Sequence, residues 1–193
     1  MTYSAFREDQ SENLRLYDTP TPKVLKAYLL GALHYATERK YTYRISQKSV
    51  EYVRFIKKAL LKAGYKAWTY KEGSNRDVHI VEFSKKILSG ITILSRDDKI
   101  NYCRGYFDSE GAVPLSLTAR YYIYFAQKDI ADLTELRDYL QDLRISCGKI
   151  HNPSKRVDSD YFRFYVLSSS FEKFAKVIGS WHPIKQSYLR MKI

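Results

Sequence analysis

Hydrophobic and polar residues follow two different periods along the chain, and these periods predict an ordered series of helices and strands. Apolar residues at helical spacing follow Thr21, a favourable N-cap, and Pro22, a favourable first-turn residue, so a helix is predicted from Pro22. Alternation over Tyr41–Ser46, and again over Tyr121–Ala126, predicts strands with one apolar face and one face free to meet a ligand. Such strands, mixed with helices, are typical of an α+β fold whose antiparallel sheets are covered on one side.

The same order of patterns occurs twice in the chain. An offset of 80 residues aligns a strand and the helix after it with a second copy, and an offset of 84 aligns the next strand, which in each copy is followed by a short amphipathic segment. The aligned pairs are Tyr43–Lys48 with Ile123–Lys128, 50–63 with 130–143, and 78–84 with 162–168, and the amphipathic segments are 85–88 and 171–177. We interpret the chain as a duplication: a polar N-terminal leader over 1–21, a first repeat over 22–98, and a second repeat over 99–193. Asp98 is predicted to be the N-cap of the second repeat's first helix.

Charge gives the first indication of a partner. The 193 residues include 33 Lys and Arg against 21 Asp and Glu, a net charge of +12, and their 45% apolar content is enough for a substantial core. The excess is +7 up to Asp98 and +5 after it, so both repeats are basic. With 18 tyrosines interleaved among the cations, this composition favours a surface that binds nucleic acid.

Composition also excludes several classes of protein. Two cysteines, Cys103 and Cys147, are too few for a disulfide scaffold or a four-cysteine zinc site. No apolar run approaches the roughly 20 residues that cross a bilayer. We therefore expect a cytoplasmic protein that meets nucleic acid and not a membrane.

The ends of the two first helices carry the most informative residues. An offset of 74 places Gly31 over Gly105, and the aligned segments read YLLGALHYAT from Tyr28 and YCRGYFDSEG from Tyr102. Two glycines at matched positions would let these helices approach closely. The second segment ends in two carboxylates, Asp108 and Glu110, of the kind that bind hard divalent cations through oxygen. Asp108 is interpreted as structural, capping a helix end.

The segment Tyr102–Gly111 resembles the second motif of the LAGLIDADG homing endonucleases, and the duplicated pattern over 22–193 resembles their overall organisation. This resemblance implies one chain with two pseudo-symmetric αββαββα repeats whose motif helices pack together. It implies antiparallel sheets that form a saddle on the major groove of double-stranded DNA, bound as a monomer. It also implies Mg²⁺ held by the last acidic residue of each motif, here Glu110.

The same resemblance implies further catalytic residues. The family's polar residue that positions solvent matches Gln47 and Gln127 on the repeated strands. Its basic active-site residues have their nearest counterparts in Lys99 and Lys185, a correspondence that rests on spacing alone. Each of these residues also has a simpler interpretation: Glu110 as a solvated helix-end acid, and the two glutamines as ordinary strand residues.

The first motif departs from the family pattern. Ala36 occupies the position of Glu110, and no carboxylate occurs from Ala32 to Thr37. Hydrolysis with paired metals needs anionic ligands on both sides, so we expect cleavage to be impaired or limited to one strand. The change of offset from 74 to 80 also shortens the first hairpin of repeat 1. We therefore expect a reduced DNA-contact surface in that half, whereas Ala112–Arg120 supplies the corresponding strand in the second.

We interpret the chain as a sequence-specific double-stranded-DNA-binding protein of the type that it resembles, with Mg²⁺-dependent endonuclease activity impaired or limited to one strand. The alternatives are a nuclease-dead DNA-binding regulator and a maturase that binds intron RNA. Candidate DNA contacts come from the strand faces directed away from the core and from basic loops. They are Arg44, Lys48, Lys66, Trp68, Tyr70, Arg76, Arg120, Tyr122, Tyr124, Lys128, Lys149, Lys155, Arg156 and Arg163.

Overall fold

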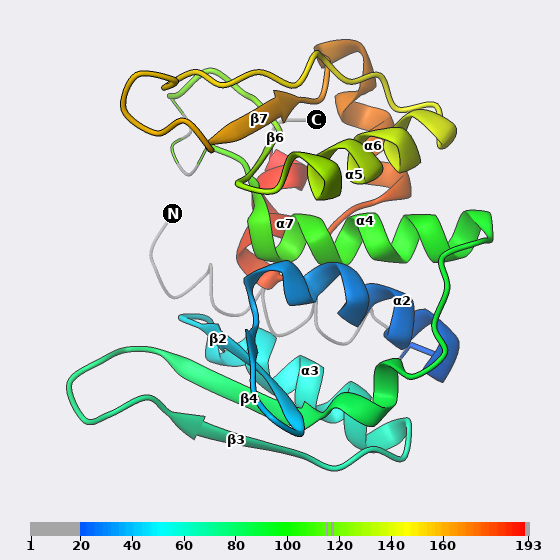
Figure 1. The fold of residues 1–193 in the computed structure, drawn as a ribbon, viewed down its shortest axis with the longest axis vertical. Coiled ribbons are helices and arrows are strands. Elements are labelled where there is room, and N and C mark those ends of the chain that lie inside the picture. The colour runs from blue at the N-terminus through cyan, green and yellow to red at the C-terminus, as the bar shows by residue number, and fades with distance from the viewer. Residues whose placement is uncertain (1–19, 115, 117, 192–193) are drawn as a thin grey trace.

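The computed structural model describes residues 20–114, 116 and 118–191, so the leader predicted over 1–21 lies outside the described residues except for its last two positions. Two α+β units lie on opposite sides of a central pair of helices, α2 (Pro22–Ala32) and α4 (Arg96–Glu110) (Figure 1). The predicted α+β architecture of two antiparallel repeats is confirmed. No helix in the described part of the chain is long and apolar enough to span a membrane.

The first repeat builds a four-stranded antiparallel sheet in the order β1-β2-β4-β3. Residues on the inner face of this sheet, including Ile45, Val81 and Phe83, are fully or almost fully buried. They pack against Ile56 and Leu60 of the helix over Val50–Lys62. The elements after α2 are η1 (Leu33–Tyr35), β1 (Thr37–Glu38), β2 (Thr42–Gln47), α3 (Val50–Lys62), β3 (Ala67–Lys71), β4 (His79–Ser84) and η2 (Lys85–Leu88).

The second repeat builds a three-stranded antiparallel sheet in the order β5-β6-β7. Phe125 and Phe164 stack on each other across this sheet, and Phe174 and Leu136 bury their other sides. The elements after α4 are β5 (Gly111–Ala112), β6 (Tyr124–Gln127), α5 (Ile130–Asp142), β7 (Phe162–Tyr165), η3 (Ser168–Ser170), α6 (Phe171–Val177) and α7 (Pro183–Met191). Each repeat thus has its own core, and the helix pair joins the two.

The first hairpin of repeat 1 is short, as predicted: β1 and β2 meet through a tight turn in which the Arg39 N–H donates to the Thr42 carbonyl (2.9 Å). The reduced DNA-contact surface expected of the first half stays a prediction; among the described residues its sheet has four strands, against three in the second half. In the second half, the described residues between Val113 and Arg120 form no strand. Pro114 lies in this stretch and cannot donate a hydrogen bond to a sheet.

The N-terminus of α4 also differs from the prediction. Thr21 caps α2 as expected, since its hydroxyl accepts from the Val24 N–H (3.4 Å). In α4, however, Ser95 is the N-cap, and Asp98 is its partner in a capping box: the Ser95 hydroxyl accepts from the Asp98 N–H (3.1 Å), and the Asp98 carboxylate accepts from the Ser95 N–H (2.9 Å). The predicted boundary between 98 and 99 therefore falls inside the first turn of α4.

The motif helices touch backbone to backbone at the two aligned glycines. A Cβ added at Gly31 would overlap the Tyr102 carbonyl oxygen and lie 2.8 Å from the Tyr106 nitrogen. A Cβ added at Gly105 would overlap the Tyr28 carbonyl oxygen in the same way. Only glycine fits at either position, which explains why the alignment places glycines there.

Candidate functional site

Each motif helix ends beside the strand that carries one of the predicted glutamines. Gly111 directly follows Glu110 and lies opposite Phe125, so Glu110 lies at the end of the hairpin where β6 reaches Gln127. In the first repeat, Thr37 lies opposite Arg44, which places the end of η1 beside the Gln47 end of β2. The Oε1 of Gln127 accepts a hydrogen bond from the Lys128 N–H (2.8 Å). The structure therefore brings each glutamine to the end of its own motif helix.

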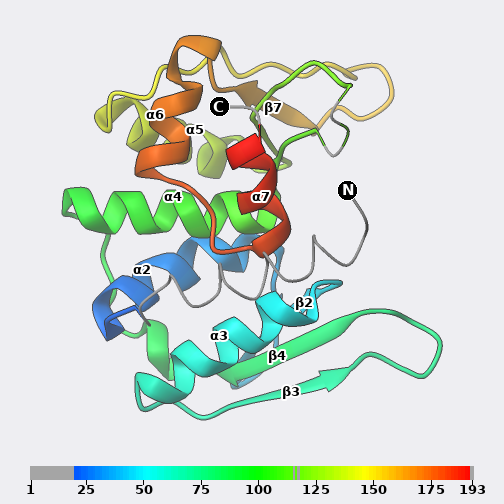
Figure 2. The same cartoon turned by 180° about the vertical axis from the view of Figure 1, so that it is seen from behind.

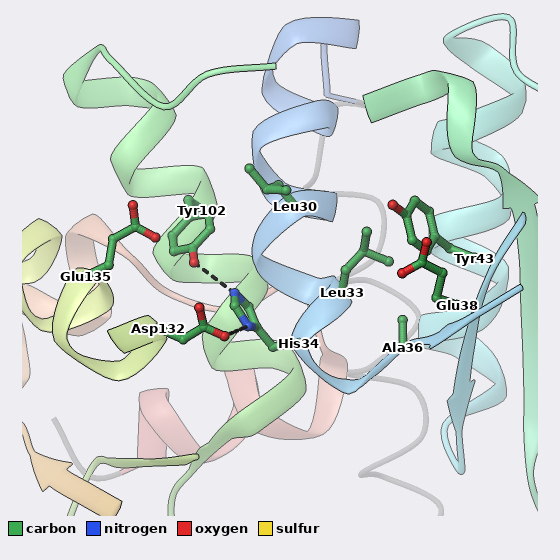
Figure 3. A pocket seen from close by; sticks show the side chains of 9 residues that line it. All are labelled: Leu30, Leu33, His34, Ala36, Glu38, Tyr43, Tyr102, Asp132 and Glu135. Carbon is green, nitrogen blue, oxygen red and sulfur yellow. Dashed lines mark hydrogen bonds and ion pairs between the residues drawn. The ribbon is translucent and has the colours of Figure 1, made fainter. Parts of the chain in front are cut away.

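Only one of these two helix ends presents a carboxylate. Glu110 is half-buried, and burial raises its pKa while the Lys185 ammonium opposes that shift. At the other end, the Ala36 methyl lies among Leu33, Glu38 and Tyr43 (Figure 3). Glu38, two residues further along, lies in β1 opposite Tyr43 and is ion-paired with Lys85.

The first repeat lacks an acid at the position equivalent to Glu110 whether the helices or the strands are aligned. The helix offset of 74 aligns Glu110 with Ala36. The strand pairings, in contrast, place Gly111 opposite Phe125 and Thr37 opposite Arg44, which aligns Glu110 with position 35. Position 35 is a tyrosine, so neither alignment gives the first repeat an acid.

Asp108 is the centre of a buried hydrogen-bond network and has the structural role expected for it. Its Oδ2 accepts from the Tyr28 hydroxyl (2.6 Å) and from the Trp181 N–H (2.9 Å), and its Oδ1 accepts from the Ser180 hydroxyl. The Tyr52 hydroxyl lies 2.6 Å from that of Tyr28. Burial raises the pKa of Asp108. The carboxylate thus ties α2, α4 and the segment before α7 together and is not available to a substrate.

A second network occupies the pseudo-symmetric position on the other side of the helix pair. His34 takes the place of Asp108, and its Nε2 is hydrogen-bonded to the hydroxyl of Tyr102, the counterpart of Tyr28 (2.8 Å) (Figure 3). Its Nδ1 lies 3.1 Å from Asp132, the counterpart of Tyr52 at the offset of 80. Burial lowers the pKa of His34 and the Asp132 carboxylate opposes this shift. The sequence prediction missed these residues, although the two offsets already align them.

Lys185 lies at the Glu110 end of α4 but is fully engaged there. Lys185 belongs to helix α7, which lies beside this end of α4 (Figure 2). Its Nζ donates to the carbonyls of Phe107 (2.7 Å), Asp108 (2.9 Å) and Gly111 (2.7 Å). Burial lowers the pKa of Lys185 to about 8. All three N–H groups of the ammonium are thus engaged by carbonyls, and Lys185 caps this end of α4.

Lys99 lies at the opposite end of the same helix. Eleven residues separate it from Glu110, about 16 Å at 1.5 Å per residue. Its ammonium is ion-paired with Asp142 of α5 and lies 5.3 Å from the centre of the Tyr139 ring. The structure does not bring Lys99 to the Glu110 end of α4, so its position lends no support to the catalytic role expected for it.

The donor set does not fit the paired-metal centre that the family resemblance implies. Residues 20–114, 116 and 118–191 contain no group of three or more His, Cys, Asp or Glu side chains placed to hold a metal ion. Glu110 contributes one carboxylate, and that of Asp108 is committed to Tyr28, Ser180 and Trp181. The carbonyls nearby are occupied by the Lys185 ammonium.

The outward face of the first sheet holds several of the predicted DNA contacts in one polar network. Arg44 is ion-paired with Glu72 (2.6 Å) and lies over the Tyr70 ring, 5.6 Å from its centre. Glu82 accepts hydrogen bonds from Tyr70 (2.7 Å) and Thr42 (2.6 Å). Hydroxyl, carboxylate and guanidinium groups therefore face outward together and can meet base edges.

The remaining predicted contacts divide by exposure. Trp68 is 44% exposed on the same face as Tyr70. Arg76 lies 3.7 Å from Glu72, and Lys128 lies 3.9 Å from Asp158. Arg76 and Lys128 are themselves exposed, and the other exposed cations of the predicted set are Lys48, Lys66, Arg120, Lys149, Lys155 and Arg156. Phosphates can reach this last group directly.

His182, beside the Asp108 network, gives the fold an acid-sensitive position. Its ring is 7% exposed, packs on that of Tyr52 (4.7 Å between centroids), and burial lowers its pKa from 6.5 to about 3. Between these values the unfolded chain binds a proton that the folded chain does not, so stability falls as the pH falls. We expect His182→Phe to flatten this loss by up to about 1.4 kcal/mol per pH unit, measured by urea unfolding from pH 7 to 4. Parallel slopes for the wild type and His182→Phe would contradict the assignment.

No protein-family model matches the sequence, and no curated protein matches it. Solved structures match its fold. The structure of I-DmoI in complex with DNA and Ca is 20% identical, with a TM-score of 0.64, and the match covers 89% of this chain and 100% of that one. The N-terminal LAGLIDADG domain of DUF199/WhiA is 18% identical, with a TM-score of 0.68, covering 89% and 91%. The chain therefore has the α+β saddle fold of the LAGLIDADG homing endonucleases.

Proposed function

We propose that the protein is a monomeric double-stranded-DNA-binding protein, of the nuclease-dead regulator type, that does not cut both strands. One observation carries the proposal: of two matched helix ends between the sheets, one presents Glu110 and the other presents Ala36. Cutting two strands requires a competent centre for each strand, and the first end has no acid under either alignment. Within residues 20–114, 116 and 118–191, the donor set also does not fit a paired-metal centre.

Charge and fold support DNA as the ligand. The net charge of +12 is divided between both repeats, and exposed cations such as Lys48 and Lys149 occur in each. A nucleic acid has regularly spaced phosphates that can bind cations spread over both repeats. The release of its counterions then favours binding. The matching I-DmoI structure contains DNA, which supports a duplex as the ligand of this saddle.

Nicking of one strand is the second candidate, because Glu110 is a half-buried acid at the only helix end that keeps one. Regulation without cleavage is favoured over nicking by Lys185. Its ammonium caps the carbonyls around Glu110 and is itself buried and hydrogen-bonded three times. Hydrolysis at the Glu110 end would therefore take place beside the Lys185 ammonium, whose three N–H groups already donate to carbonyls.

A selection of bound duplexes from a random library, followed by binding measurements across salt concentrations, tests the proposal. We expect one enriched site and a steep linear loss of log affinity with log salt, with a slope of about −0.9 per phosphate neutralised. Affinity that does not change with ionic strength would overturn the electrostatic basis of the proposal.

A supercoiled plasmid carrying the selected site then separates the functions in buffer with Mg²⁺ or Mn²⁺. We expect the plasmid to remain supercoiled while the protein stays bound. Open circles that disappear in Glu110→Gln would establish nicking in its place. Linear product would contradict the proposal, because it requires cleavage of both strands.

A further inference from the structure

The outward face of the second sheet carries a continuous row of aromatic rings. Tyr122 lies 5.5 Å from Tyr124, Tyr124 lies 5.6 Å from Tyr165, and Tyr165 lies 6.2 Å from His151, measured between ring centroids. Tyr124 comes from β6 and Tyr122 from the residues just before that strand. Tyr165 comes from β7, and His151 from the segment that bridges β7 at Arg163. We refer to these four residues as the aromatic row.

Positive charge accompanies the aromatic row. The guanidinium of Arg163 lies over the Tyr165 ring, 5.3 Å from its centre, and Lys149 is exposed on the adjoining segment. Among the described residues, the outward positions of β6 and β7 next to these rings are Ala126 and Arg163, and none is a carboxylate. The face is therefore cationic and aromatic, which suits an anionic ligand with flat rings.

The first sheet presents different chemistry at the matching place. There Glu72 and Glu82 hold Arg44, Thr42 and Tyr70 in a network of ion pairs and hydrogen bonds. Such groups can read the edges of paired bases, which a duplex exposes in its grooves. The two halves of the saddle are thus not equivalent as binding surfaces.

A base inside a duplex already stacks on its neighbours and offers a protein only its edge. An aromatic side chain gains stacking only from a base that has left the duplex, and cations beside the ring then hold its phosphates. The aromatic row has the features of a stacking surface, whereas the first sheet has those of a groove-reading surface.

We propose that the aromatic row of the second sheet binds unpaired nucleotides of a DNA strand that is continuous with the duplex on the first sheet. The inference deepens the proposed function, because it relies on that function for the duplex half of the ligand. Continuity favours DNA over RNA, since both sheets belong to one saddle and one strand can pass from one to the other.

Binding of fluorescent probes by anisotropy tests this. The probes are a blunt duplex carrying the selected site, the same duplex with a single-stranded DNA extension at the end over the second repeat, the same duplex with an RNA extension, and the single strands alone. We expect the DNA extension to tighten binding by about tenfold for each stacked base. An extension that adds no affinity would overturn the proposal, and so would a clear preference for the RNA extension, which would identify RNA as the occupant.

Matched variants identify stacking as the cause. Tyr124→Leu with Tyr165→Leu should abolish the gain from the extension, whereas Tyr124→Phe with Tyr165→Phe should keep it, because phenylalanine keeps the ring and loses only the hydroxyl. If the phenylalanine pair loses as much as the leucine pair, hydroxyl contacts carry the binding and the proposal fails. Thermal unfolding checks that all variants fold, and Tyr122→Leu against Tyr122→Phe repeats the comparison should the double leucine variant not fold.

Binding of the blunt duplex distinguishes a failure of this proposal from a failure of the proposed function. If the leucine pair weakens the blunt duplex as much as the extended one, the aromatic row contacts paired DNA, and only the inference about unpaired nucleotides fails. If the wild-type protein binds extensions and single strands but not the blunt duplex, the proposed function fails while the aromatic row retains its role.

Discussion

Gly105→Ala should destabilise the protein strongly although it adds one methyl group. In an ordinary helix this change is stabilising by up to about 1 kcal/mol. Here the new Cβ would overlap the Tyr28 carbonyl oxygen and lie 2.9 Å from the Ala32 nitrogen, both of them backbone atoms of the facing helix. Because backbone cannot rotate away as a side chain can, α2 and α4 must separate along their contact. We expect a loss of about 3 kcal/mol, the upper end of overpacking costs.

Thermal unfolding measures this effect. A loss of that size corresponds to a fall in Tm of about 6 to 12 °C for a chain of this length. Gly148→Ala is the matched control, because a Cβ there would lie 3.6 Å from the Tyr165 carbonyl oxygen, an ordinary contact. A Gly105→Ala protein with the Tm of the wild type would show that the helices are not in backbone contact.

Asp108→Ala should have a comparable or larger effect for an electrostatic reason. It removes the acceptor of the Tyr28 hydroxyl, the Ser180 hydroxyl and the Trp181 N–H, all of them buried. It also removes one of the two carboxylates that compensate the buried ammonium of Lys185. Truncating one partner of a buried charged network typically costs about 3–5 kcal/mol, because the other groups stay buried and unpaired.

Urea unfolding of the two variants Asp108→Ala and Asp132→Ala compares the stability contributed by the two pseudo-symmetric networks. Asp132 belongs to the pseudo-symmetric network, but its side chain is 40% exposed, so water can replace its contact with His34. Exposed pairs contribute about 0 to 1 kcal/mol, and we expect Asp132→Ala to fall in that range. Equal losses in the two variants would contradict the assignment of Asp108 as the buried centre.

The repeated order of elements was predictable from the sequence because it rests on local periodicity. The helices predicted over 50–63 and 130–143 occur as α3 and α5, and each is one residue shorter. The start of α4 was not predictable to the residue, because Ser95 and Asp98 are both good N-caps and only their reciprocal hydrogen bonds decide between them.

The site was less predictable because spacing along the chain does not fix where a long side chain ends. Spacing along the chain alone suggests Lys99 and Lys185 as active-site residues. The structure shows one of them 11 residues along α4 from Glu110 and the other capping that helix end with all of its donors. Ala36 could be read directly, because the presence or absence of a carboxylate does not depend on the fold.

The two tyrosine networks make the halves of this duplicated chain dependent on each other. A pairing of two second repeats would place Tyr102 between Asp108 of one copy and Asp132 of the other, with a single hydroxyl proton to share between two carboxylates. The existing pairing avoids this conflict, because Tyr28 and Tyr52 face Asp108 while His34 separates Tyr102 from Asp132. Each half therefore needs the other as its partner at this contact, because a symmetric pair of second repeats would set two carboxylates against one tyrosine hydroxyl.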